Sequence, residues 1–209
     1  MFPNDILLAY LLAVLVVVIA PGPDNILAIS RGLSQGRVAA GLSSVGAGLG
    51  IMVHTVAATL GLALVLQTSP LAFWVVKAVG AAYLMWLGCK AIFSRSLISF
   101  VPAARQPLKR VFLTGLMSNV LNPKPGLFVV AFIPQFCSAT RGPVPAHMLV
   151  YGAIFAVLTA IIFTVLGAFA AQLSQALSRR PRLVVGANVG AGLTFIAAGV
   201  SILALDRRR

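Results

Sequence analysis

Two charged side chains lie deep within long apolar runs of this sequence. Asp24 follows Pro21-Gly22-Pro23, and Lys124 lies within Asn122-Pro123-Lys124-Pro125-Gly126. A carboxylate or an ammonium at membrane depth is costly, so it usually serves a substrate, an ion or another charged group. One acid and one base match the two charges of a zwitterion such as an amino acid. We therefore predict a site for a small zwitterion, with a structural Asp24–Lys124 salt bridge as the alternative or as the empty state.

The residues before Asp24 predict a membrane helix that is interrupted near its middle. Pro21 and Pro23 lack a backbone N–H and restrict the residues before them, and the glycine between them adds backbone freedom. As a helix, residues 6–20 would rise only roughly 22 Å, less than a bilayer core of about 30 Å. The span must continue past the break, with Asp24 or Asn25 as the N-cap of its second half. A simple proline kink with a locally hydrogen-bonded acid is the alternative.

The second interruption predicts a start for another half-helix. Asn122 is a good N-cap and Pro123 a good first helical residue, and the free N–H groups there favour an anion such as a carboxylate. Asn119 lies three residues earlier, on the same helix face. The predicted substrate-binding residues are Asp24, Asn25, Asn119, Asn122 and Lys124, and the predicted helix-break residues are Pro21, Gly22, Pro23, Pro123, Pro125 and Gly126. Asp24 would bind the substrate ammonium; Lys124 and the two half-helix starts would bind its carboxylate.

Asp24 and His54 are the candidates for proton coupling. Asp24 can bind a proton or a substrate ammonium in alternation, which is the simplest way to couple the two movements. His54 lies in the middle of the second apolar run, and the ordinary pKa of histidine suits proton transfer. A hydrogen-bonded packing role is the alternative for this histidine.

The composition predicts an all-α polytopic membrane protein. Of the 209 residues, 60% are hydrophobic and 9% are charged, and the mean hydropathy is +1.02. The net charge of +13 does not indicate a nucleic-acid partner, because the basic residues lie between apolar runs, as the positive-inside rule predicts. Cys89 and Cys137 are far apart and form no C-x-x-C pattern, so we expect ordinary buried thiols. No metal site, cofactor site or catalytic motif is predicted.

We predict six membrane spans in a single domain that covers residues 1–209. The spans cover about 5–30, 38–66, 71–93, 111–137, 145–177 and 183–205, with a short loop at 31–37. The first and fourth spans hold the two interruptions, so we predict two three-helix repeats, 1–93 and 111–209, joined by a cytoplasmic loop at 94–110. Three helices per repeat require the second repeat to be inverted. Paired broken helices in corresponding positions indicate a transporter site at the repeat interface.

The basic residues predict the orientation of the spans. One side of the membrane would hold Arg31, Arg37, Lys90, Arg95, Arg105, Lys109, Arg110, Arg179, Arg180 and Arg182. The other side would hold fewer of them: Lys77, Arg141, Arg207, Arg208 and Arg209. By the positive-inside rule the richer side is cytoplasmic, which places both termini on the outer side of the membrane.

At these motifs the chain resembles the LysE/RhtB family of bacterial amino-acid exporters. The likeness lies in Pro21–Asn25, Ser30–Gly32 with Gly36, Gly80–Gly88, Asn119–Lys124 and Phe132–Phe136, and it spans essentially the whole chain. It implies six helices in the bacterial inner membrane and proton-driven export of amino acids or their derivatives, without an enzymatic step. Cadmium exporters and thiol-disulfide electron carriers of the same superfamily are the alternatives. The electron carriers, however, need cysteines at the helix breaks, and a metal exporter normally needs more carboxylates.

The balance of charges predicts the class of cargo. With one buried acid and one buried base, a neutral amino acid leaves no charge unpaired, whereas lysine brings a second ammonium. We therefore expect neutral amino acids to be preferred. The expected partners are the amino acid, protons and the lipid bilayer, and not nucleic acid; the sequence leaves a homo-oligomer open.

Overall fold

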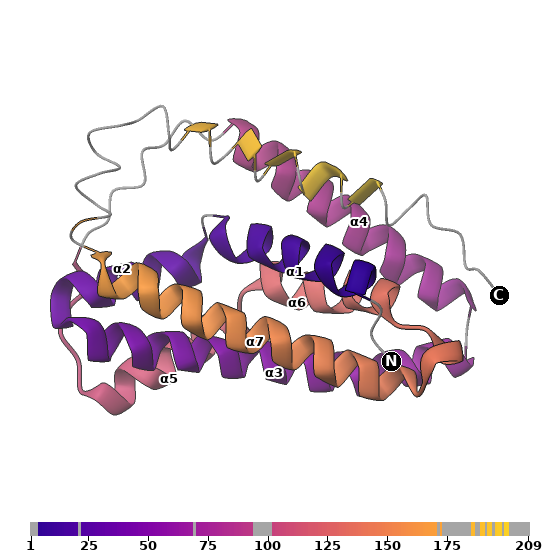
Figure 1. Cartoon of the computed structure of the whole chain (residues 1–209), viewed down its shortest axis with the longest axis horizontal. Coiled ribbons are helices and arrows are strands. Elements are labelled where there is room, and N and C mark those ends of the chain that lie inside the picture. The colour runs from indigo at the N-terminus through magenta and orange to yellow at the C-terminus, as the bar shows by residue number, and fades with distance from the viewer. Residues whose placement is uncertain are drawn as a thin grey trace.

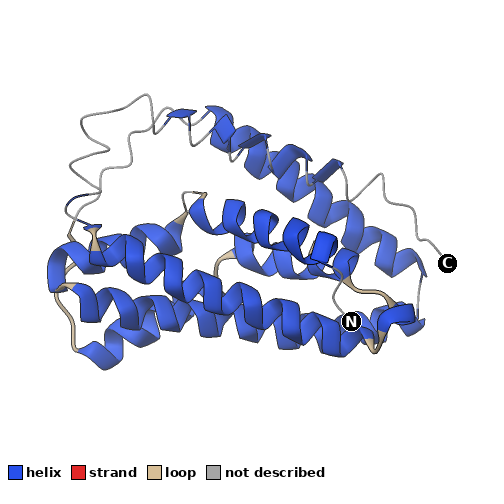
Figure 2. Ribbon diagram, in the orientation of Figure 1, coloured by secondary structure: helices blue, strands red, loops and turns tan. Residues whose placement is uncertain are grey.

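The structure is a computed structural model that describes residues 4–20, 22–68, 70–93, 102–170 and 172, with scattered positions between 185 and 200. Every regular element in these residues is a helix (Figure 2). The all-α prediction is therefore confirmed for the described part of the chain. Outside it lie Pro21, most of the predicted sixth span, and the arginines Arg95, Arg179, Arg180, Arg182, Arg207, Arg208 and Arg209.

The helices follow the predicted spans closely. In chain order they are α1 (Asn4–Ile19), α2 (Pro23–Gln35), α3 (Arg37–Thr68), α4 (Pro70–Phe93), α5 (Leu108–Val120), α6 (Pro123–Ala131), the short 3₁₀ segments η1 (Ile133–Phe136) and η2 (Ala139–Arg141), and α7 (Val144–Ala168). The predicted second and third spans correspond to α3 and α4, and the fifth corresponds to α7 as far as it is described.

The two predicted interruptions are present as bends between short helices. α1 and α2 meet at 60°, and α5 meets the segment Pro123–Phe136 at 52°. α3, over Arg37–Gly61, and α7, over Val144–Ala168, are each long and apolar enough to cross a membrane, and each bent pair can form one further span. The chain is therefore a multi-pass membrane protein.

α3 lies at the centre of the bundle. It packs along α5 and α7 and also contacts α2, α4 and α6. Figure 1 shows α3 and α7 side by side along the long axis, with the described residues after 185 beside α4. Side chains at Gly46 and Gly115 would meet the backbone of the facing helix at Phe112 and Ser43 respectively, so these crossings require glycine. The central helix is thereby held close to the elements that carry the bends.

The predicted loop at 31–37 is wrong. α2 continues to Gln35, and only Gly36 separates it from α3. Gly36 has a φ of 82°, a left-handed conformation that glycine adopts without steric cost, so one residue turns the chain. Arg31 is consequently buried in the helix, where its guanidinium donates to the Ala104 carbonyl and to Gln106 Oε1. These bonds tie the segment before α5 to α2.

Candidate functional site

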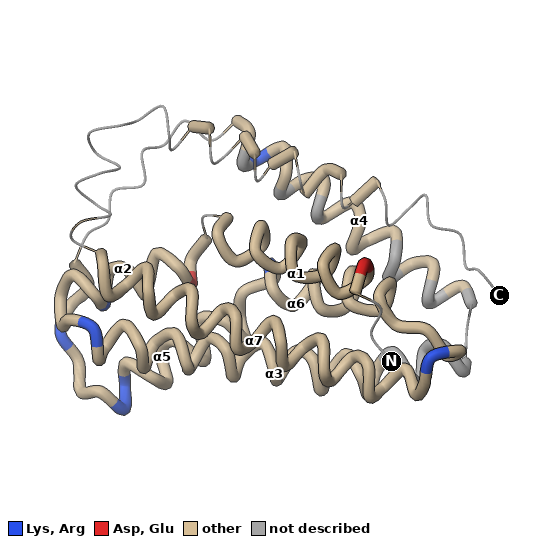
Figure 3. The backbone as a smooth tube through the Cα atoms, in the orientation of Figure 1, with Lys and Arg blue, Asp and Glu red and all other residues tan. Residues whose placement is uncertain are grey.

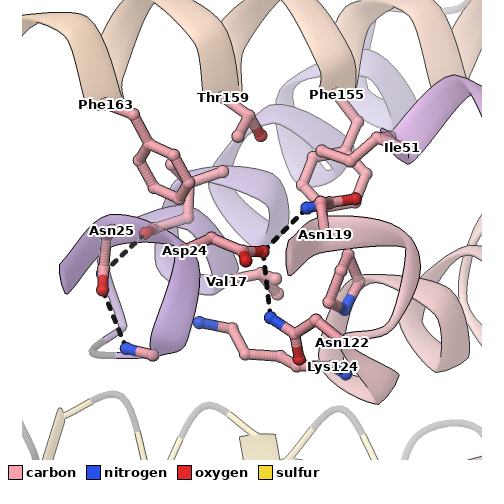
Figure 4. A pocket seen from close by; sticks show the side chains of 13 residues that line it. Val17, Asp24, Asn25, Ile51, Asn119, Asn122, Lys124, Phe155, Thr159 and Phe163 are labelled. Atoms are coloured by element: carbon pink, nitrogen blue, oxygen red, sulfur yellow. Dashed lines mark hydrogen bonds between the residues drawn. The ribbon is translucent and has the colours of Figure 1, made fainter. Parts of the chain in front are cut away.

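The candidate site forms where the two bends face each other inside the bundle. Most of the described Lys and Arg residues lie near the ends of the bundle, whereas an acidic position lies at the bend between α1 and α2 (Figure 3). A small cavity of about 20 Å³ there is lined by both bends and by α3 and α7 (Figure 4). Its polar lining is Asp24, Asn25, Asn119, Asn122, Lys124 and Thr159, and its apolar lining includes Val17, Val18, Ile51, Phe155 and Phe163. All five predicted substrate-binding residues are thus brought together.

The Asp24 carboxylate accepts three hydrogen bonds from side chains at the second bend. Asp24 lies in the first turn of α2 and is 7% exposed. Ser118 Oγ donates to its Oδ1 at 2.7 Å, and the side-chain amides of Asn119 and Asn122 donate to its Oδ2 at 2.8 and 2.9 Å. A buried carboxylate is costly unless it is hydrogen-bonded, and these three donors offset that cost. The acid of the first bend is therefore held by the second bend.

The start of α2 differs from the prediction. We predicted Asp24 or Asn25 as the N-cap, but the N-cap is Gly22 and α2 begins at Pro23. Proline suits the first helical position because the N–H that it lacks would have no partner there. Asn25 instead reaches back: its Oδ1 accepts from the Gly22 N–H at 2.8 Å and its Nδ2 donates to the Ala20 carbonyl at 3.0 Å. This leaves the Asp24 carboxylate free to point across to the second bend.

At the second bend the half-helix has the predicted N-cap, but the break lies slightly earlier in the chain than predicted. Asn122 Oδ1 accepts from the Lys124 N–H at 3.0 Å, and Pro123 is the first residue of α6. The prediction that Pro125 and Gly126 break the helix is wrong, because both lie inside α6. A proline in a first turn removes an N–H that has no helical partner, so the helix tolerates it. The break lies just before Pro123.

Lys124 does not hydrogen-bond to Asp24. Its Nζ donates to the Ala20 carbonyl at 2.7 Å, just after the end of α1, where carbonyls lack helical partners and a cation is favoured. Each charged side chain therefore binds the bend of the other half. We call this pair of contacts, Asp24 to Asn119 and Asn122, and Lys124 to Ala20, the reciprocal brace. The brace takes the place of the direct salt bridge that the sequence left open.

His54 lies beside the site and not among the residues that line the cavity. Its Nε2 is 3.1 Å from the Asn119 carbonyl, and its ring packs against Gly126, where a β-carbon would come within 2.9 Å of Cε1. Asn119 thus contacts His54 through its backbone carbonyl and Asp24 through its side-chain amide. The contact agrees with a packing role, and the proton-carrier role stays a prediction.

Two polar residues of the site were not identified from the sequence. Ser118 directly precedes Asn119 and completes the donors to Asp24. Thr159 lies in the middle of α7, is 2% exposed, and has a hydroxyl without a hydrogen-bond partner among the described residues. A polar residue within the apolar run of α7 indicates a site residue, but Thr164 is also a polar residue in the same run. The sequence alone does not separate these two threonines.

Neither the cysteines nor the other metal-binding residue types favour the two alternatives from the superfamily, a metal exporter and a thiol-disulfide electron carrier. Both cysteines are free thiols, but the prediction that they are buried is wrong for Cys89, which is exposed, and Cys137 is only partly buried. Within the described ranges, no three His, Cys, Asp or Glu side chains are grouped to hold a metal ion.

Comparison with known proteins gives a consistent set of relatives. A family model described as LysE type translocator matches residues 15–205. An uncharacterized membrane protein of Vibrio cholerae is 33% identical over 194 residues, which cover 92% of this chain and 94% of that protein. The homoserine/homoserine lactone efflux protein of Salmonella typhi is 29% identical over 192 residues, which cover 91% of this chain and 92% of that protein. The leucine efflux protein of Enterobacter sp. is 25% identical over 198 residues, or 94% of each chain. No solved structure matches the chain.

Proposed function

This chain belongs to the LysE type translocator family, and from that premise we propose that it exports an amino acid or a close derivative by secondary active transport. The observation that carries the proposal is one cavity, between two bent helices, that is lined by the Asp24 carboxylate and the Lys124 ammonium. The two charges of a zwitterion complement these groups, and charge-assisted hydrogen bonds are strong in a site shielded from water. Relatives named for efflux of leucine and of homoserine support a small neutral cargo.

The size of the cavity supports a mechanism in which the cargo opens the site. A volume of about 20 Å³ is enough for roughly one water molecule and too small for an amino acid. In the proposed cycle the substrate ammonium competes for Asp24 and the substrate carboxylate competes for Lys124. Both contacts of the reciprocal brace are then exchanged for contacts with the cargo, and the two bends separate. Such movement of one repeat against the other is the usual basis of alternating access.

Asp24 is also the proposed proton-coupling residue, with His54 as the second candidate. Protonation neutralises the carboxylate and removes its attraction for the substrate ammonium. Proton and cargo therefore bind in alternation, and an inward proton gradient across the bacterial inner membrane would drive the cargo outward.

Export of neutral amino acids is expected to exceed that of lysine. An unpaired second ammonium at membrane depth costs roughly 2.5–3.5 kcal/mol, or about a hundredfold in affinity, and a wet open cavity reduces this difference. The measurement is efflux from cells preloaded with dipeptides of threonine, leucine or lysine, with and without an uncoupler. Fastest efflux of lysine, abolished by the uncoupler, would contradict the assigned charge balance.

We also propose that the chain forms one domain with two inverted three-helix repeats, 1–93 and 111–209, and that both termini are periplasmic. The paired bends support the repeat, since each is followed by a long helix, α3 or α7. The excess of basic residues after the first, third and fifth spans supports the orientation.

Two cysteine substitutions at exposed positions test the orientation. In a chain without Cys89 and Cys137, Leu108→Cys at the start of α5 should resist an impermeant maleimide in intact cells. Thr140→Cys, in η2 between α6 and α7, should label in the same cells, because it lies on the periplasmic side. Both positions should label after permeabilisation. The opposite pattern in intact cells would invert the proposed topology while leaving the repeat unaffected.

A further inference from the structure

A buried threonine of α7 lines the cavity. Thr159 is 2% exposed and lines the cavity, yet its Oγ1 has no hydrogen-bond partner there. Burying a hydroxyl without a partner is unfavourable, so packing alone is a poor reason for a threonine at this position. Valine would have the same shape without that cost.

The other helical threonines with described side-chain contacts satisfy their hydroxyls within their own helix. The hydroxyls of Thr55, Thr59, Thr114 and Thr164 each donate to the carbonyl four residues earlier, at 2.6–2.8 Å. Thr159 makes no such bond to the Phe155 carbonyl. Its hydroxyl is therefore available to a ligand, and Figure 4 shows the side chain extending from α7 on the cavity side.

The surroundings of Thr159 indicate which part of a ligand it would meet. Phe155 and Phe163 lie one turn before and after it on the same face of α7, and both line the cavity. In Figure 4 Asp24 lies between Thr159 and Lys124. A zwitterion with its ammonium at Asp24 and its carboxylate toward Lys124 would therefore direct its side chain toward α7.

We infer that Thr159 recognises the side chain of the cargo through a hydrogen bond. This inference rests on the proposed export function. The Thr159 hydroxyl would hydrogen-bond a short hydroxylated side chain, while Phe155 and Phe163 contact the carbon atoms. The cargo class is then neutral amino acids with a side-chain hydroxyl, in preference to their aliphatic isosteres. A site built around a buried polar group penalises an analogue that leaves this group unpaired.

The test uses pairs of amino acids that differ only by a hydroxyl in place of a methyl group. Threonine and valine form one pair, and homoserine and norvaline form the other. Purified protein in proteoliposomes is assayed for exchange, with each amino acid as competitor. The wild-type protein should prefer the hydroxylated member by about tenfold. Thr159→Val should bring the preference to within about twofold, and Thr159→Ser should restore it.

Thr164→Val is the matched control. It makes the same substitution on the same helix, but at a hydroxyl that is bonded to Ala160, so the tenfold preference should remain. An unchanged preference in Thr159→Val would overturn the inference. So would an equal loss for both members of a pair, because the hydroxyl would then serve the common ammonium or carboxylate. Failure of the export proposal looks different: the wild-type protein would exchange no amino acid at all.

Discussion

Asp24→Asn is expected to lower amino-acid export about thirtyfold or more without preventing membrane insertion. The asparagine carbonyl can keep the bonds from Asn119 and Asn122, and its amide can donate to the Ser118 hydroxyl, which accepts as well as donates. The contacts of the bend survive and only the charge is lost. Removing one member of a buried charge pair costs about 2–5 kcal/mol, and about 2 kcal/mol corresponds to about thirtyfold.

The measurement is exchange of a neutral amino acid in proteoliposomes that contain equal amounts of folded protein. Ser118→Ala is the control, because it removes one hydrogen bond from Asp24 and keeps the charge. It should lower the rate less than Asp24→Asn does, because Asp24 keeps its charge and the bonds from Asn119 and Asn122. Wild-type rates from Asp24→Asn vesicles would show that the carboxylate has only a structural role.

Lys124→Gln is expected to cause the second large loss, about ten- to a hundredfold in affinity for the cargo. Glutamine keeps a donor for the Ala20 carbonyl but has no charge for the substrate carboxylate. Hydrogen bonds to charged groups contribute about 1.5–3 kcal/mol, which gives this range. The charge should matter only for ligands that carry a carboxylate.

Competition by an amino acid and by its methyl ester separates these roles. The wild-type protein should bind the amino acid more tightly than the ester, and Lys124→Gln should remove most of that difference. Lys90→Gln is the control, since Lys90 is exposed and lies 5.0 Å from the ring centre of Trp86, near the end of α4. If Lys124→Gln weakens amino acid and ester equally, Lys124 acts through the brace and not on the carboxylate.

The main site residues could be predicted from the sequence because burying a charged side chain within an apolar run costs free energy. A lone acid and a lone base inside apolar runs, each beside prolines, are visible without a structure. The positions of the breaks were less well predicted. Pro125 and Gly126 look like helix breakers, yet a first turn tolerates them, and the helix starts at Pro23 rather than after Asp24.

Other features of the site leave no trace in residue types. Lys124 binds a backbone carbonyl, which every residue possesses, so its partner cannot be read from side chains. The donors to Asp24 are 94 to 98 residues away along the chain. The roles of Thr159 and Thr164 depend on which face of α7 each occupies and on whether a carbonyl accepts from its hydroxyl.

The reciprocal brace has a consequence for how the protein is made. Its contacts join residues 95 to 104 positions apart, so no half of the chain holds both partners. At about 5–20 residues per second, several seconds separate the synthesis of Asp24 from that of its donors. During that interval the first half presents an uncompensated acid to the insertion machinery and to membrane proteases. Synthesis of both halves as one chain keeps the interval short, whereas two separate half-proteins would each wait for a chance encounter.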